Sequence, residues 1–152
     1  MGAAVQPLPM SEDSLQDRMP YANLLDIELV EAADGHAVGR MPMTPDHSSN
    51  TETLIAHGGA TYSLADTVGG AGGISMTDLA TPTVDMRIDY LAPVTSDLRA
   101  EADVVRFGGS IALSRVEVYD EEGTHVATAH GTYKTGGSNE GTPWDSEAGQ
   151  AE

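Results

Sequence analysis

The sequence predicts a single α+β domain in which one long helix packs against six mostly antiparallel strands. Segments with the alternating pattern of half-buried strands lie on both sides of one segment with helical period. Glycine-containing turns separate neighbouring strands. The length of 152 residues and the 39% hydrophobic content suit one compact core. The helix can bury its apolar stripe only by lying across one face of the sheet.

The first two predicted strands form a hairpin around Asp34-Gly35. Apolar residues alternate with polar ones over residues 25–29, and small or apolar residues occupy every second position over residues 37–43. The Asp-Gly pair provides the positive φ angles that a tight hairpin turn needs. Pro42 and Pro45 end the second strand, because proline lacks the N–H that a sheet requires.

The helical segment begins near His57 and extends to the mid-70s. Ala60, Leu64 and Val68 follow one another at the four-residue spacing of a buried helix face. The stretch "GGAGGIS" at its end contains four glycines, each costing about 1 kcal/mol relative to alanine in a helix interior. Two interpretations stay open: a frayed end, or a helix pressed so closely against the sheet that side chains do not fit. A phosphate loop is disfavoured, because no Gly-Lys-Ser/Thr follows.

Four strands in close succession complete the predicted sheet. The stretch "TVDMRIDYL" alternates cleanly, with Val84, Met86, Ile88 and Tyr90 on one face. "LRAEADVVRF" follows and turns at Gly108-Gly109 into "SIALSRVEVYD". The turn "EEGT" then leads into "HVATAHGTYKT".

The sequence predicts a domain over residues 21–135 with a flexible extension on either side. Residues 1–20 are rich in proline, serine and acids and have little periodicity, so we expect a flexible or loosely docked N-terminal extension. Residues 136–152 are rich in glycine, serine and acids, which predicts a disordered acidic tail.

The charge balance excludes several classes of partner. Acidic residues outnumber basic ones 24 to 7, and a net charge of −17 opposes binding to nucleic acid or to a membrane surface. We expect a cytoplasmic protein, because the N-terminus lacks a signal-peptide pattern and no apolar run is long enough to span a bilayer. The acidity indicates either a functional acidic surface or adaptation to a high-salt cytoplasm. The scattered distribution of the acids favours the second.

The stretch "HGGATYSLAD" at residues 57–66 is the candidate catalytic segment. The first N–H groups of a helix lack internal partners, and glycine lets a ligand approach them, so Gly58-Gly59 could form an oxyanion hole. Asp66 is the only acid in residues 53–77. It either faces solvent or acts as a cap, or else it serves as general base or nucleophile. With no cysteine and no metal-binding motif, we expect neither a metal nor a cofactor.

"HGGATYSLADTVGGA" together with "TVDMRIDYLAP" resembles the hotdog-fold acyl-CoA thioesterases of the PaaI-like branch, related to the enzymes of phenylacetic acid degradation and to 4-hydroxybenzoyl-CoA thioesterases. The resemblance covers about residues 22–134. It implies a hotdog fold, in which a six-stranded sheet wraps around one long central helix. This arrangement favours the close-packing interpretation of the helix glycines.

The resemblance also implies roles for individual residues. Asp66 matches the catalytic carboxylate, and Gly58 matches the residue whose backbone N–H polarises the thioester oxygen. His57 matches a histidine that orients the site, and Thr83 matches a hydroxyl position that can hold the attacking water. Asn50 resembles the family's loop asparagine, although it precedes His57 by seven residues where the family pattern has six.

The implied substrate is an acyl-CoA, and the implied assembly is a homodimer or a homotetramer with the site at a dimer interface. Relatives often carry a basic residue where this chain has Ser110, which leaves Arg106 and Arg115 as nearby candidates for contact with the coenzyme A phosphates. Two alternatives remain: a non-catalytic module that binds acyl-CoA, and a hotdog hydratase that would use the Asp46-His47 pair.

Overall fold

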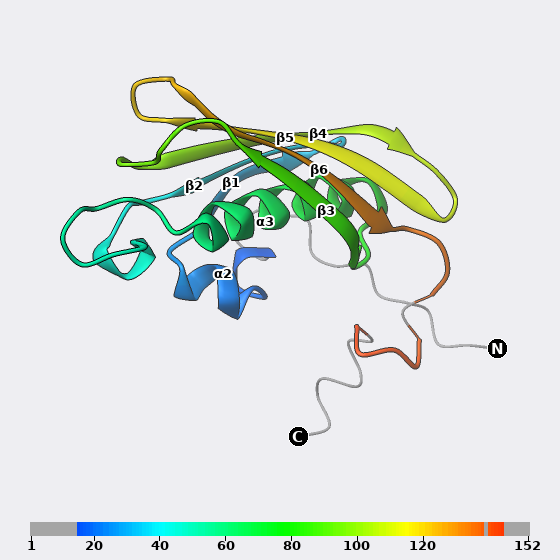
Figure 1. Ribbon diagram of the computed structural model, residues 1–152. Coiled ribbons are helices and arrows are strands. Elements are labelled where there is room, and N and C mark those ends of the chain that lie inside the picture. The colour runs from blue at the N-terminus through cyan, green and yellow to red at the C-terminus, as the bar shows by residue number, and fades with distance from the viewer. Residues whose placement is uncertain (1–14, 139, 145–152) are drawn as a thin grey trace.

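The computed structural model describes residues 15–138 and 140–144 and shows a curved antiparallel sheet lying over one 20-residue helix (Figure 1). This confirms the predicted α+β class and is the arrangement of the hotdog fold. The sheet has six strands in the order β1-β2-β4-β5-β6-β3. The elements are α2 (Pro20–Leu24), β1 (Glu28–Ala33), β2 (His36–Met41), the 3-10 turn η1 (Pro45–His47), α3 (Gly58–Thr77), β3 (Thr83–Tyr90), β4 (Leu98–Phe107), β5 (Ile111–Asp120) and β6 (His125–Lys134).

The predicted hairpins are confirmed. Asp34 and Gly35 join β1 to β2 with φ angles of 52° and 81°, in the region that the Asp-Gly pair favours. Residues 108–110 join β4 to β5. The prediction is wrong at the start of β1, because the strand begins at Glu28 and Leu25 is instead the C-cap of α2.

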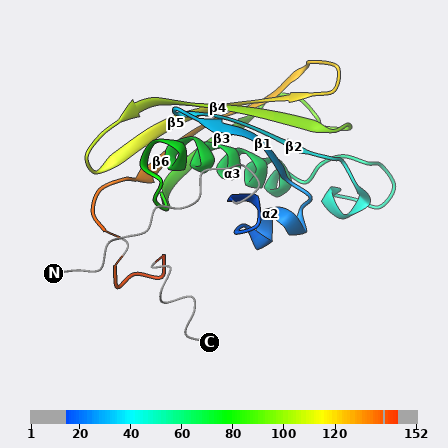
Figure 2. The same ribbon diagram turned by 180° about the vertical axis from the view of Figure 1, so that it is seen from behind.

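Residues 15–20, which the sequence assigned to the flexible extension, pack against the domain. Leu15 is buried. The side chain of Gln16 donates to the carbonyl of Ile27 (2.8 Å) and accepts from the N–H of Leu29 (2.6 Å). The following helix α2 lies on the side of α3 that faces away from the sheet (Figures 1 and 2). Residues 1–14 of the predicted extension lie outside the described residues.

The segment after β6 also contacts the domain. Residues 136–138, together with Thr142 and Trp144, line a small pocket beside Pro82 and Val84 at the start of β3. The predicted disordered tail therefore includes residues that contact the sheet. Residue 139 and residues 145–152 of that tail lie outside the described residues.

The glycines of α3 allow the helix to lie very close to the sheet. A Cβ atom on Gly69 would collide with the hydroxyl of Tyr133 on β6. A Cβ on Gly73 would lie 3.1 Å from the hydroxyl oxygen of Thr81, in the segment that joins α3 to β3. The helix continues to Thr77, so the close-packing interpretation is confirmed and the frayed end is wrong. Close contact with the sheet compensates for the low helix propensity of these glycines.

Gly69→Ala should lower the free energy of unfolding by about 1–3 kcal/mol, because the added methyl group overpacks the contact with Tyr133. Gly70→Ala is the matched control. Its Cβ would lie 3.5 Å from the Tyr133 ring, which is an ordinary contact, and alanine improves helix propensity. Urea denaturation at constant KCl measures both variants, and equal destabilisation of the two would contradict this packing.

Candidate active site

The N-terminus of α3 leaves one backbone donor free. His57 is the N-cap, and its Nδ1 atom accepts a hydrogen bond from the Gly59 N–H (2.8 Å). The Ala60 N–H donates to the His57 carbonyl (2.9 Å). The Gly58 N–H has no hydrogen-bond partner among the described residues. Gly58 therefore presents a free N–H donor at the end of the helix where the dipole favours negative charge.

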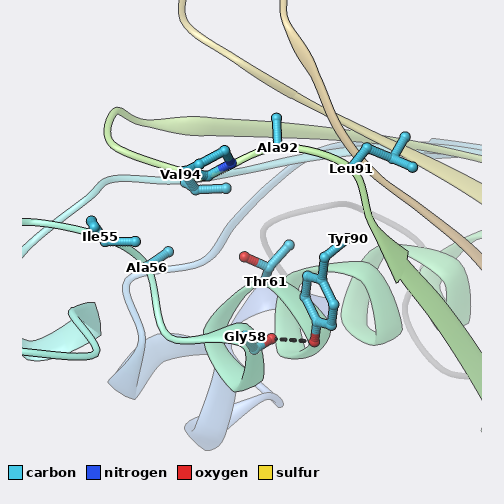
Figure 3. A pocket seen from close by; sticks show the side chains of 9 residues that line it. Ile55, Ala56, Gly58, Thr61, Tyr90, Leu91, Ala92 and Val94 are labelled. Atoms are coloured by element: carbon cyan, nitrogen blue, oxygen red, sulfur yellow. Dashed lines mark hydrogen bonds between the residues drawn. The ribbon is translucent and has the colours of Figure 1, made fainter.

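Gly58 forms part of the wall of a pocket of about 420 Å³ (Figure 3). The Tyr90 hydroxyl, at the end of β3, donates to the Gly58 carbonyl (2.7 Å) and so joins the helix start to the sheet. The lining is mostly apolar and suits a non-polar group next to the free amide. The lining residues are Ile55, Ala56, Gly58, Thr61, Tyr90, Leu91, Ala92, Pro93 and Val94.

Asp66 lies two turns further along α3 and is half-buried. Its Oδ1 atom accepts a hydrogen bond from the Thr83 hydroxyl (2.8 Å). The Tyr133 hydroxyl shares its hydrogen between the same Oδ1 atom (3.3 Å) and the Asp66 backbone carbonyl (3.2 Å). The Oδ2 atom has no hydrogen bond to any described residue. Two hydroxyl groups thus orient the carboxylate and leave one oxygen available to a water molecule or a substrate.

The two tyrosines near Asp66 remain neutral donors. Burial raises the pKa of Tyr133, and the Asp66 carboxylate raises it further. Burial likewise raises the pKa of Tyr62, with additional contributions from the negative charges of Asp66 and Asp85. The Tyr62 hydroxyl donates to the carbonyl of Met86 on β3 (3.4 Å).

The structure brings the predicted residues together in two separate groups. His57 and Gly58 lie at the helix start, whereas Asp66 and Thr83 are hydrogen-bonded to each other. Eight residues of α-helix separate Gly58 from Asp66, a distance of about 12 Å along the axis. The two groups therefore cannot contact the same carbonyl within one chain.

Asn50 belongs to neither group in this chain. Its Oδ1 atom accepts from the N–H groups of Glu52 (3.0 Å) and Thr53 (2.7 Å), which closes a turn in the exposed loop before α3. The hydratase candidate His47 is buried, and its Nδ1 atom bonds to the Pro42 carbonyl (2.8 Å). Its ring is therefore held by the backbone.

Sequence reasoning missed two residues that support the site. The sequence pattern assigns Tyr133 to the last strand and Tyr90 to the apolar face of its strand, but it indicates no role for either residue at the site. The alternation of residues along β6 is the one sequence signal for Tyr133. It predicts that the side chain points inward, but it does not identify Asp66 as the hydrogen-bond partner. Within the described residues, no group of three or more histidines and carboxylates could hold a metal ion, and no helix is long and apolar enough to cross a membrane.

Tyr133→Phe should make stability less sensitive to alkaline pH. The unfolded chain releases the Tyr133 proton near pH 10, whereas the folded chain retains it to higher pH, because its pKa is raised. The contribution of this group is therefore complete below about pH 10 and decreases above it, by at most about 1.4 kcal/mol per pH unit. Urea denaturation from pH 9 to about pH 11 should give a shallower loss for Tyr133→Phe. Equal slopes for the variant and the wild type would contradict this assignment.

Comparison with known proteins identifies the family. The model of the Thioesterase superfamily matches residues 55–127. The medium/long-chain acyl-CoA thioesterase YigI of Escherichia coli K12 is 28% identical, over 88% of this chain and 96% of its own length. The X-ray structure of a thioesterase-superfamily protein is 30% identical over 84% of this chain and 96% of its own, with a TM-score of 0.76. E. coli PaaI, from the phenylacetic acid degradation operon, is 25% identical over 83% of this chain and 91% of its own, with a TM-score of 0.73. The chain belongs to the thioesterase superfamily of hotdog-fold thioester hydrolases.

Proposed function

We propose that this protein is an acyl-CoA thioesterase in which the Gly58 N–H of one subunit and Asp66 of the partner subunit act on the same thioester. The observation that carries the proposal is the free Gly58 N–H at the wall of an apolar pocket, on a helix that also holds an oriented carboxylate. The similarity to YigI, named as an acyl-CoA thioesterase, supports the substrate class.

A second copy of the chain can complete the site. If two α3 helices lie antiparallel across a two-fold axis near Tyr62, midway between Gly58 and Asp66, each Gly58 meets the partner's Asp66. The position of β3 at one end of the sheet supports such pairing, because its outer edge has no strand beside it among the described residues. We therefore propose a homodimer as the catalytic unit, which could pair again into a homotetramer.

In the proposed reaction the acyl pocket places the thioester carbonyl oxygen at the Gly58 N–H. Asp66 takes a proton from water while the water oxygen bonds to the carbonyl carbon, and the N–H stabilises the resulting oxyanion. Collapse of the tetrahedral intermediate breaks the carbon–sulfur bond, and the thiolate receives the proton from Asp66. The products are a carboxylic acid and free coenzyme A. Direct attack by Asp66, followed by hydrolysis of the anhydride, would use the same two groups.

The remaining predicted residues have positioning roles in this proposal. Thr83 donates its hydrogen to Asp66, and its oxygen can still accept a hydrogen bond from the attacking water. The His57 Nδ1 atom accepts the hydrogen bond of the Gly59 N–H, so the Gly58 N–H is the donor that remains for the substrate. Asn50 shapes the loop before His57.

We also propose that the enzyme works in a cytoplasm of high salt. None of the described acidic residues is buried, and the whole chain has a net charge of −17, so the acidic side chains at the surface repel one another at low ionic strength. Molar salt shortens the screening length to about 3 Å and removes this repulsion.

Asp66→Asn should reduce thioester hydrolysis by about 10²- to 10⁴-fold, because the amide cannot accept the proton of water. Asp78→Asn is the matched control. It makes the same chemical change at the other end of α3, where residue 78 has a φ of 56° that asparagine tolerates. Thiol release from a panel of acyl-CoAs in molar KCl measures both variants. Full activity of Asp66→Asn would remove Asp66 from the mechanism. A wild type that binds acyl-CoA without releasing thiol would leave a non-catalytic acyl-CoA-binding module as the better account, and loss of enoyl-CoA absorbance without thiol release would indicate a hydratase.

Gly58→Pro tests the oxyanion donor itself. Proline suits the first position of a helix, and the extended backbone of His57 (ψ 137°) is compatible with a following proline. Gly58→Ala is the control, since it adds a Cβ near the Tyr90 hydroxyl, as proline also does, but retains the N–H. We expect kcat of Gly58→Pro to fall about 10²- to 10³-fold below that of Gly58→Ala. Similar kcat values for the two variants would exclude the Gly58 N–H from the mechanism.

A further inference from the structure

One buried hydroxyl in the wall of the Gly58 pocket has no hydrogen-bond partner. Thr61 is 1% exposed and lines this pocket. Among the described residues, five histidine, serine or threonine side chains are buried, and the other four all have a hydrogen bond: His47, Ser63, Thr81 and Ser114. The Thr61 hydroxyl has none to any residue that the structure describes.

The local geometry of α3 leaves this hydroxyl facing the pocket. A threonine in a helix commonly donates to the carbonyl one turn before it, which is that of His57 here. That carbonyl instead accepts from the N–H groups of Ala60 (2.9 Å) and Thr61 (3.5 Å). In Figure 3 the Thr61 side chain points away from α3, toward Ala92 and Val94 on the opposite wall. An unpartnered buried hydroxyl costs free energy, which a polar group of a ligand can recover.

The pocket offers the Thr61 hydroxyl to a ligand together with the Gly58 N–H. The Tyr90 hydroxyl is already bonded to the Gly58 carbonyl (2.7 Å), and the other side chains of the lining are apolar. Thr61 follows Gly58 by three residues, a rise of about 4.5 Å along the helix axis. A ligand that uses both donors therefore carries two oxygen atoms only a few bonds apart.

We propose that Thr61 makes the Gly58 pocket selective for 3-hydroxyacyl groups, an inference that rests on the proposed function. With the thioester carbonyl oxygen at the Gly58 N–H, a hydroxyl on the third carbon is close enough to bond to the Thr61 hydroxyl, which can donate or accept. The rest of the acyl chain lies against the apolar side chains of Ile55, Leu91 and Val94. A hydroxyl on the far side of an aromatic ring would be too distant from the carbonyl to use both donors.

Paired substrates test the selectivity directly. The wild type should have a kcat/KM for 3-hydroxyhexanoyl-CoA about threefold to tenfold above that for hexanoyl-CoA, because one neutral hydrogen bond distinguishes them. Thr61→Val should remove this preference, and Thr61→Ser should retain it. Thr81→Val is the matched control, since that buried hydroxyl bonds to the Gly70 carbonyl (3.3 Å) outside the pocket. A wild type without the preference, or an equal preference in Thr61→Val, would overturn the proposal.

Stability gives a second readout that needs no activity. Thr61→Val removes a hydroxyl that has no partner, so the midpoint of urea denaturation should stay the same or rise. Thr81→Val loses the hydrogen bond to Gly70, so its midpoint should fall. An equal fall for both variants would show that the Thr61 hydroxyl has a structural role, and the proposal would be wrong.

Binding measurements separate this proposal from the catalytic one. A wild type that hydrolyses neither ester would overturn the proposed function, and calorimetric titration with the same two esters would then test the pocket alone. A lower Kd for the 3-hydroxy ester that disappears in Thr61→Val would support the selectivity of the pocket. Equal Kd values for the two esters in the wild type would overturn it.

Discussion

The close contact between α3 and Tyr133 is the constraint on which both the packing and the site depend. Tyr133 is fully buried, and its hydroxyl fits beside α3 because Gly69 has no side chain. On the neighbouring strand, the Ser114 hydroxyl donates to the Gly69 carbonyl (3.2 Å). The same Tyr133 hydroxyl lies 3.3 Å from the Asp66 carboxylate. The helix–sheet distance and the orientation of the candidate catalytic group therefore have one physical cause.

The helix holds two chemical functions at a fixed separation. Its first turn offers a free amide beside an apolar pocket, and Asp66 lies about 12 Å further along the axis. A rigid α-helix cannot bring these groups together, so in the proposed mechanism one chain contains two half-sites. In the proposed dimer the same rigidity becomes useful, because two antiparallel helices would position both half-sites without any movement of the backbone.

Local signals predicted most of the fold and part of the site. Periodicity and turn chemistry were sufficient for the hairpin at Asp34-Gly35 and for the extent of α3, because neighbouring residues determine these features. The partner of Asp66 could not be predicted, since Tyr133 lies 67 residues away and the contact depends on the closeness of the helix to the sheet. The packing of Gln16 was missed for the same reason. The contacts of Asn50 are local, in contrast, because its side chain accepts a hydrogen bond from the Thr53 N–H of its own loop.

Mixing two inactive variants tests most directly whether the site is shared between subunits. Asp66→Asn and Gly58→Pro chains, refolded together, should form mixed dimers in which one of the two sites has both groups intact. With random pairing, half of the dimers are mixed and half of their sites are intact, so activity should recover to about a quarter of the wild-type value. Activity that stays at the level of the separate variants, although mixed dimers have formed, would show that Gly58 and Asp66 of different chains do not act together.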